Sequence, residues 1–255
     1  MMPAKDQKII WLVGASSGIG KDLALQLAAQ GHKIIVSARR DMELGKLATE
    51  YPGQIFPLPL DVCDRGNKTL HANALASLAD DIDIFIYNSG TAQYASGNDV
   101  SYLDTTLPVY EVNFFGFLYC LDLAMPLLKK PGGKKLIAAV ASLSTYLALP
   151  RAEAYGSSKM ALVYFLDSLR ADVYEHNIDV TIINPGFVET PLTAKNDFPM
   201  PWIWTSHQAA SYIAKQLPKH KAEIRFPLLL AAVLRLASWL PKKFLARHMQ
   251  FMVKN

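Results

Sequence analysis

The chain has 255 residues, of which 51% are hydrophobic and 19% are charged, and its formal net charge is +4. This composition excludes an intrinsically disordered chain and allows one large α/β domain, or two small ones, with a substantial buried core. No dense block of Lys and Arg precedes the C-terminal region, which argues against a nucleic-acid-binding protein.

Short apolar runs alternate with helical patterns along most of the chain. In chain order, the patterns predict a strand at Lys8–Val13, a helix at Gly18–Gln30, a strand at Lys33–Ala38, a helix at Met42–Glu50, a strand at Ile55–Leu60, a helix at Asn67–Leu78, a strand at Ile82–Tyr87, a helix at Thr105–Leu128, a strand at Lys135–Val140, a helix at Glu153–Glu175 and a strand at Asp179–Ile183. This alternation predicts an α/β fold with a doubly wound parallel sheet, Rossmann-like, and a ligand crevice at the carboxyl ends of the strands. We expect one domain at residues 1–226 and an apolar, basic extension at residues 227–255.

The N-terminal segment and the two cysteines indicate a cellular location. Residues 1–8 are polar and contain no apolar segment of the kind that directs secretion. Cys63 and Cys120 lie in apolar segments, where buried free thiols are typical of a reducing compartment. We therefore expect a cytoplasmic protein, either free or peripheral to a membrane. We expect no metal site, because metal-ligand spacing is absent around the histidines His207, His220 and His248.

A glycine-rich segment, Gly14-Ala15-Ser16-Ser17-Gly18-Ile19-Gly20, falls between the first predicted strand and the first predicted helix. Glycine lets the backbone approach a pyrophosphate closely, and a helix N-terminus supplies free N–H donors and positive dipole. The predicted phosphate-binding residues are Gly14, Ser16, Ser17, Gly18, Ile19 and Gly20. The alternative is a glycine turn with a purely structural role.

The end of the second strand favours one nucleotide over the other. The strand ends in Ala38-Arg39-Arg40, where an acidic residue would bind the ribose hydroxyls and repel a 2′-phosphate. Arginine does the opposite, so the sequence favours NADP(H) over NAD(H). The alternative is that Arg39 and Arg40 are solvated surface residues.

Two side chains with acid–base potential share one face of a predicted helix. Tyr155 and Lys159 are four residues apart, so they point into the same space. A nearby ammonium stabilises phenolate and lowers the pKa of a phenol from its usual value near 10. A tyrosine in this position can donate a proton to a carbonyl oxygen, or remove one from an alcohol.

Two polar residues complete this candidate site. Ser142 follows the strand that ends at Val140, and its hydroxyl would hydrogen-bond the substrate oxygen. Ser144 is the alternative for that role. Asn113 lies within an apolar helical stretch, where it either satisfies backbone groups around a kink or anchors a water that relays protons from Lys159. Both interpretations of Asn113 can hold at once.

Over about residues 8–226 these motifs resemble the short-chain dehydrogenase/reductases. The resemblance implies that Asn113, Ser142, Tyr155 and Lys159 form the catalytic tetrad. It also implies cofactor contacts from further residues, namely adenine contacts from Asp61 and Val62, nucleotide contacts from Asn88, Ser89 and Gly90, and nicotinamide contacts from Pro185, Gly186, Val188 and Thr190. The sequence departs from the family pattern at Val13, at Tyr87 and at Ser89. The resemblance further implies a homodimer or homotetramer formed through the helices predicted at Thr105–Leu128 and Glu153–Glu175.

The segment after Thr190 corresponds to a variable flap over the substrate in the family. It is apolar and aromatic, which suits a hydrophobic carbonyl or alcohol such as a lipid, steroid or aromatic ketone. The alternative is that Trp202 and Trp204 pack against the core. The candidate substrate-contacting residues are Tyr94, Leu143, Tyr146, Phe187, Phe198 and Trp202.

Residues 226–241 are almost continuously apolar, and basic residues follow them. Sixteen residues with Arg235 near the centre are too short to span a bilayer comfortably. The segment is therefore buried on the subunit or in an oligomer interface, lies on anionic lipid as an amphipathic anchor, or covers the substrate as a lid.

The sequence thus predicts an NADP(H)-dependent oxidoreductase that interconverts a carbonyl and a secondary alcohol, acts on a small, apolar substrate, and uses Tyr155 as general acid/base. Two alternatives remain. One is a membrane-associated reductase of lipid ketones or sterols. The other is a non-catalytic NADP-binding sensor or scaffold.

Overall fold

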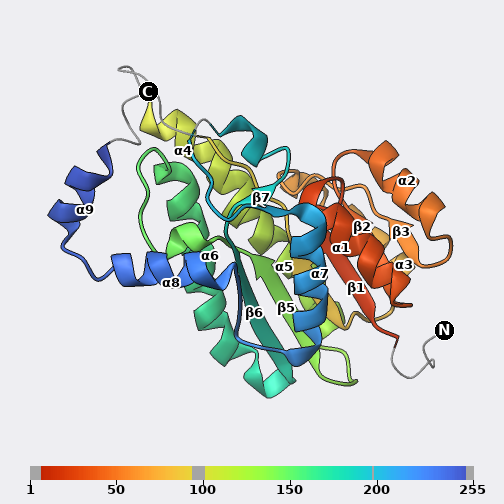
Figure 1. Cartoon of the computed structure of the whole chain (residues 1–255). Coiled ribbons are helices and arrows are strands. Elements are labelled where there is room, and N and C mark those ends of the chain that lie inside the picture. The colour runs from red at the N-terminus through yellow and green to blue at the C-terminus, as the bar shows by residue number, and fades with distance from the viewer. Residues whose placement is uncertain (1–6, 94–100, 197, 251–255) are drawn as a thin grey trace.

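The computed structural model describes residues 7–93, 101–196 and 198–250. Seven parallel strands form one sheet in the order β3-β2-β1-β4-β5-β6-β9, with helices on both faces (Figure 1). The strands are β1 (Ile9–Val13), β2 (Lys33–Ser37), β3 (Ile55–Pro57), β4 (Ile84–Tyr87), β5 (Lys135–Val140), β6 (Ile178–Pro185) and β9 (Glu223–Phe226), while β7 (Val188–Glu189) pairs separately with β8 (Trp204–Thr205). The predicted doubly wound α/β fold is confirmed.

The helices are α1 (Gly18–Ala29), α2 (Asp41–Glu50), α3 (Lys68–Leu78), α4 (Tyr102–Tyr110), α5 (Gly116–Leu128), α6 (Glu153–Asp172), α7 (Ser206–Gln216), α8 (Leu228–Ala237) and α9 (Lys242–His248). The chain starts at β1 in the middle of the sheet, winds outward through β2 and β3, and returns to β4 on the other side of β1. The strand order therefore reverses between β1 and β4, and ligands bind at such a reversal point in this type of sheet.

Each face of the sheet carries its own apolar core. Along β1, Ile10 and Leu12 belong to the cluster under α1 and α7, and Trp11 and Val13 belong to the cluster under α3, α5 and α6. All four side chains are fully buried, because successive residues of a strand point to opposite faces and both faces are covered. This double burial explains why the strands read as continuous apolar runs.

Two of the predicted elements differ from those observed. The predicted strand Ile55–Leu60 ends at Pro57, although the N–H groups of Leu58 and Leu60 still donate to the carbonyls of Val36 and Ala38 at 2.9 and 3.1 Å. The predicted helix Thr105–Leu128 begins earlier, at Tyr102, where the hydroxyl of Ser101 accepts from the Asp104 N–H. It is also interrupted by a π-helical turn at Glu111–Phe115. The remaining predicted boundaries differ by up to three residues.

The stretch Tyr102–Leu128 is, among the described residues, long and apolar enough to cross a membrane, and 56% of its most apolar window is buried inside the domain. Its second half, α5, packs against α3 and β4. That packing is typical of a core helix.

The predicted burial of the thiols holds for one cysteine. Cys120 is fully buried, but Cys63 is only partly buried. Burial raises the pKa of both thiols above the usual value.

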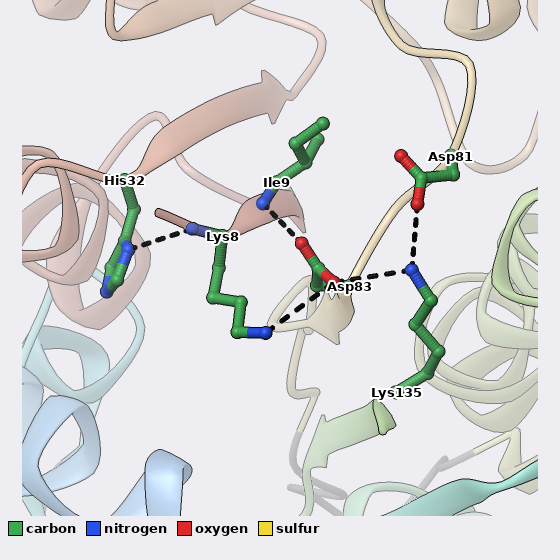
Figure 2. Close-up of polar contacts among 6 residues, drawn as sticks. All are labelled: Lys8, Ile9, His32, Asp81, Asp83 and Lys135. Atoms are coloured by element: carbon green, nitrogen blue, oxygen red, sulfur yellow. Dashed lines mark hydrogen bonds and ion pairs between the residues drawn. The ribbon is translucent and has the colours of Figure 1, made fainter. Parts of the chain in front are cut away.

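A buried lysine links two strands at the amino edge of the sheet (Figure 2). The ammonium of Lys135, at the start of β5, donates to Asp81 at 2.9 Å and to Asp83 at 3.3 Å. Its side chain is 2% exposed, while those of Asp81 and Asp83 are 37% and 16% exposed. Burial alone would lower the pKa of Lys135, but the two carboxylates outweigh that effect and raise it. Asp83 also accepts from the Ile9 N–H at 2.9 Å, so one carboxylate joins the starts of β1, β4 and β5.

Replacing this cation should destabilise the fold. We expect Lys135→Met to lower the free energy of unfolding by about 2–4 kcal/mol, because it leaves two partly buried carboxylates without their shared partner. The matched control is Lys134→Met, which removes a neighbouring lysine that is 56% exposed and paired with Asp179 at 2.7 Å. That change should cost less than about 1 kcal/mol. Urea unfolding measures both, and equal losses would contradict the structural role of Lys135.

Candidate active site

A cavity of about 680 Å³ opens at the carboxyl ends of β1, β2, β4, β5 and β6. The predicted cofactor-binding residues that line it are Gly14, Ser16, Ser17, Gly18, Ile19, Arg39, Arg40, Asp61, Val62, Asn88, Ser89, Gly90, Tyr155, Lys159, Pro185, Gly186, Val188 and Thr190. The fold thus brings together motifs that are spread over most of the sequence.

Gly20 is the predicted cofactor residue that does not line the cavity. It is buried, and a Cβ atom there would lie 2.2 Å from the carbonyl oxygen of Gly14 and 2.5 Å from Nδ2 of Asn88. Glycine at this position therefore lets the first turn of α1 pack directly against the loop that precedes it.

The glycine loop is fixed between two strands. Gly14 has a φ of +90°, and a Cβ atom there would lie 2.5 Å from the backbone nitrogen of Ser89. Its N–H donates to the Ser37 carbonyl at 2.7 Å, and its carbonyl accepts from Nδ2 of Asn88 at 2.9 Å. The end of β2 and the end of β4 thus hold this turn in place.

The start of α1 has the chemistry of an anion site. Ser17 is the N-cap residue, but its side chain makes no capping hydrogen bond, so it leaves the first N–H groups of the helix available. Gly18 has a φ of +54°, and a Cβ atom there would lie 2.9 Å from Cγ2 of Thr190. The absence of that atom lets the Thr190 loop pass close to the helix start. These features fit the phosphates of a dinucleotide.

The two arginines after β2 lie at one end of the cavity and are exposed. Arg40 reaches the glycine loop, where its Nη2 and Nε donate to the Ser16 hydroxyl at 2.8 and 3.2 Å. Asp61 lies nearby in the cavity wall, and its Oδ1 accepts from the Cys63 N–H at 3.0 Å.

Lys159 is a buried cation beside Tyr155. Lys159 is 3% exposed, and its Nζ donates to the Val140 carbonyl at 2.8 Å. Nζ also lies 5.9 Å from the centre of the Tyr155 ring. Burial lowers the pKa of Lys159 from 10.5 to about 8. As their spacing predicts, both residues lie on one face of α6, and both line the cavity.

Asn113 lies in the π-helical turn and is completely buried. Its Oδ1 accepts from the Thr91 N–H at 2.8 Å, and its Nδ2 donates to the Thr91 carbonyl at 3.0 Å and to the Ser158 hydroxyl at 2.9 Å. Asn113 therefore binds backbone groups of the loop after β4, whereas the prediction placed those groups around a kink in its own helix; the proton relay stays a prediction. A Cβ atom on Gly90 would lie 3.4 Å from Nζ of Lys159 and 3.6 Å from Oδ1 of Asn113, so these two polar groups flank the same glycine.

Ser142 adjoins the cavity without being among the residues that line it. Its hydroxyl accepts from the Ser144 N–H at 3.1 Å and keeps its own O–H to donate. Its backbone N–H donates to Asn184 at 3.2 Å, and Asn184 donates to Glu223 at 2.7 Å. Sequence reasoning missed Asn184 and Glu223. The position of Asn184 at the end of a strand, directly before Pro185-Gly186, was the available signal.

None of the described substrate candidates lines this cavity, and their contact with a substrate stays a prediction. Leu143, Tyr146 and Phe187 pack in one cluster with Leu230 and Ala231 of α8. The Tyr146 hydroxyl donates to Glu223, and burial is the largest cause of a raised pKa for Tyr146. Tyr94 lies outside the described residues.

The flap aromatics divide between packing and exposure. Phe198 contacts Phe187 with the ring centres 6.1 Å apart, and Trp202 is about half exposed. Trp204 stacks on Phe226 at 5.0 Å, so for Trp204 the core-packing interpretation is correct. The remaining cavity wall was not named as a site from the sequence and consists of Ala38, Leu60, Thr91, Gln93, Pro108, Val112, Val140, Ala141, Pro191, Leu192 and Thr193.

Comparisons with known proteins agree with this geometry. Residues 8–199 match the family described as short chain dehydrogenase. The chain is 32% identical over 233 residues to an uncharacterized oxidoreductase of Myxococcus xanthus, covering 90% of this chain and 91% of that protein. It is 29% identical over 198 residues to 11-beta-hydroxysteroid dehydrogenase 1A of Arabidopsis thaliana, covering 73% of this chain and 54% of that protein. It spans between 54% and 61% of the length of the animal and plant relatives it matches.

Two solved structures share the fold. A short chain dehydrogenase/reductase from Burkholderia phymatum in complex with NAD has a TM-score of 0.81 at 18% identity, covering 92% of this chain and 94% of that chain. A short chain dehydrogenase from Burkholderia cenocepacia in complex with NADP has a TM-score of 0.80 at 20% identity, covering 95% and 97%. The chain belongs to the short-chain dehydrogenase/reductase family, and it is an oxidoreductase of that family.

The buried Lys159 should make stability depend on pH in a specific window. At pH 7 the lysine is charged in both the folded and the unfolded state, and burial of the charge disfavours folding by about 3 kcal/mol, at about 1.4 kcal/mol for each pKa unit. The folded protein releases the proton above the folded pKa of about 8, while the unfolded chain keeps it up to 10.5. The free energy of unfolding should therefore rise between pH 8 and 10.5 because of this group.

Lys159→Met should remove that rise. Other groups that titrate in the window are common to both proteins, so the difference between the two stability curves isolates Lys159. Lys129→Met, which replaces an exposed lysine, should keep the wild-type slope. Denaturant unfolding at pH 7, 8, 9 and 10 measures the three curves; parallel curves for wild type and Lys159→Met would contradict the depressed pKa.

Proposed function

We propose that this protein is an NADP(H)-dependent oxidoreductase that interconverts a carbonyl and a secondary alcohol on an apolar substrate, with Tyr155 as general acid/base. The observation that carries the proposal is the pairing of Tyr155 with the buried ammonium of Lys159 in the wall of a cavity shaped for a dinucleotide.

The residues of the cavity fit the cofactor. The glycine loop and the start of α1 would hold the pyrophosphate. Asp61 and Val62 would contact the adenine side. Thr190 and the segment Pro185–Val188 would contact the nicotinamide side. When bound, the nicotinamide supplies or accepts the hydride, which no side chain of the protein can do.

The protein supplies the proton and the orientation of the substrate oxygen. The Lys159 ammonium, placed in a dry environment, would stabilise the phenolate form of Tyr155 and so make its hydroxyl a better acid. The Ser142 hydroxyl would donate to the substrate oxygen, because accepting from the Ser144 N–H leaves its O–H to donate. Asn113 would hold Thr91 and the loop after β4 against α6, and a water held beside it would relay protons from Lys159.

The preference for NADP(H) rests on Arg39 and Arg40. Both line the cavity where the second strand ends. The two positions that follow this strand are Ala38 and Arg39, so neither carries the acidic side chain that would bind ribose hydroxyls. Arg40 donates to the Ser16 hydroxyl in the glycine loop, and from there its guanidinium would bind a 2′-phosphate.

One alternative shares the reacting groups of this proposal. A membrane-associated reductase of lipid ketones or sterols would use the same reacting groups, and the similarity to a plant hydroxysteroid dehydrogenase supports an apolar substrate for either reductase.

A homodimer or homotetramer in the cytoplasm completes the proposal. Large apolar side chains are exposed on α4 and α6, namely Tyr102, Leu103, Leu107, Met160 and Tyr164. These two helices pack against each other, so the exposed side chains supply a continuous candidate surface for a second copy.

Removing one hydroxyl should stop the reaction. We expect Tyr155→Phe to lower turnover by about 10³-fold and to leave NADPH affinity within about threefold, since general acid–base catalysis contributes 10²–10⁴-fold. The control is Tyr174→Phe, just after the same helix, whose tyrosine is 81% exposed and should be dispensable. Reduction of a panel of aromatic and steroid ketones measures turnover, and nucleotide fluorescence measures binding. Retained activity in Tyr155→Phe would exclude its assigned role.

The two arginines should distinguish the two nucleotides. We expect the wild type to bind NADPH at least about tenfold tighter than NADH, and Arg39→Ala and Arg40→Ala to weaken NADPH while leaving NADH within about twofold. The control is Lys46→Ala on α2, where the lysine is 72% exposed and pairs with Glu43. Isothermal titration of both nucleotides measures the affinities; equal wild-type affinities would remove the arginines from the argument.

A further inference from the structure

The helix α8 has one face on the domain and one face in solvent. Leu230 and Ala231 are buried, at 5% and 3% exposed, against Leu143. Leu229, Val233 and Leu236 are exposed by between 44% and 60%. These three residues lie four and three positions apart, so they share one side of the helix. The outer side of α8 is therefore an apolar stripe that nothing in the described chain covers.

The apolar surface continues beyond α8. Trp239 and Leu240, in the turn before α9, are 80% and 44% exposed, and Phe244 in α9 is 47% exposed. The helix α9 has no buried residue. Figure 1 shows α8 and α9 at one side of the molecule, with α9 projecting furthest from the sheet. We call the exposed set of Leu228, Leu229, Val233, Leu236, Trp239, Leu240 and Phe244 the C-terminal surface.

The excess positive charge of the chain falls in the same part of the sequence as this surface. Residues 227–255 contain five Lys and Arg, namely Arg235, Lys242, Lys243, Arg247 and Lys254, and no Asp or Glu. The whole chain has 26 Lys and Arg and 22 Asp and Glu, so the first 226 residues hold 21 basic and 22 acidic residues. The net positive charge of the protein therefore resides entirely in its last 29 residues.

We propose that the C-terminal surface docks on an anionic lipid membrane, with α8 and α9 lying flat on it. An exposed apolar stripe flanked by lysines and a tryptophan matches the boundary between acyl chains and negatively charged headgroups. The ten residues of α8 reach about 15 Å, half the thickness of a bilayer core, so this helix lies on the membrane and does not cross it. The helices α4 and α6 also expose apolar residues, but acidic residues lie among them and basic residues are not concentrated there. That other surface is therefore better suited to a second protein copy.

The docking surface adjoins the wall of the cavity. A Cβ atom on Gly186 would lie 2.8 Å from Cδ2 of Leu230, so the inner face of α8 touches a residue that lines the cavity. Docking through the outer face would hold the cavity next to a source of apolar substrates. The membrane contact itself goes beyond the proposed reaction and does not depend on it, because it needs neither nucleotide nor substrate.

Vesicle binding tests the proposal in the absence of nucleotide and substrate. The full chain is mixed with sedimentable vesicles of phosphatidylcholine alone, or with 30% phosphatidylglycerol, and the bound fraction is measured by centrifugation. We expect binding to the anionic vesicles at least about tenfold tighter than to the neutral ones, and weakened by added salt. Trp239 should shift its fluorescence to shorter wavelength on binding, and Trp239→Phe should abolish most of that shift.

Matched variants separate a docking surface from general stickiness. Lys242→Ala with Lys243→Ala should weaken anionic binding about tenfold, whereas Lys129→Ala with Lys130→Ala, an exposed pair elsewhere, should not. Leu236→Ser should weaken binding, whereas Leu70→Ser on α3, equally exposed, should not. Unaltered NADPH binding by each variant verifies its fold.

Three results would overturn the proposal. The first is no sedimentation with anionic vesicles. The second is binding that neutral vesicles or the Lys129 and Lys130 variant match. The third is a dimer, seen by light scattering, that Leu236→Ser dissociates, which would assign the surface to a second copy of the chain. Tyr155→Phe should lose turnover and keep vesicle binding. That result would show that the docking and the reaction are tested independently of each other.

Discussion

One buried ammonium sets the geometry around which the site is built. Lys159 is 3% exposed and lines the cavity, and its Nζ donates to the Val140 carbonyl at the end of β5. Burial of this charge is costly, which is why its pKa falls to about 8. A fold under selection for stability alone would place an apolar residue here. The cost makes sense where the charge acts on a neighbour, and the neighbour across the same helix face is Tyr155.

The π-helical turn that holds Asn113, close to this lysine, also contacts Tyr87, where the sequence departs from the family pattern. In the turn, the Gly116 N–H bonds to the Glu111 carbonyl, so the Val112 carbonyl is left over, and the Tyr87 hydroxyl donates to it. Gly116 has no room for a side chain, because a Cβ atom would lie 2.6 Å from that hydroxyl. Tyr87 thus supports the turn that orients Asn113. Tyr87 departs from the family pattern, but its hydroxyl has a hydrogen-bond partner of its own and the reacting groups stay in place.

The parts that sequence reasoning predicted are those encoded locally. The strands follow from apolar runs, and the glycine loop follows from its place between a strand and a helix. The parts it could not predict depend on residues far apart in the chain. Tyr146 is satisfied by Glu223, which lies 77 residues away, and Leu143 is covered by α8, so neither is at the cavity wall. Helical spacing showed that Tyr155 and Lys159 share a face, but it could not show how deeply Lys159 is buried.

The division of charge in the chain has a consequence for how the molecule meets a negatively charged surface. A nearly neutral domain that carries all of its excess positive charge at one end behaves as an electrical dipole, and a negative surface turns such a molecule before contact. At physiological ionic strength the field extends only about 8 Å, so the groups that decide the final pose are those on the exposed helices, Lys242, Lys243 and Arg247. Because α8 is attached to the cavity wall through Leu230, orientation of the tail also orients the cavity. The same short helix therefore relates the surface on which the protein rests to the site where the substrate would react.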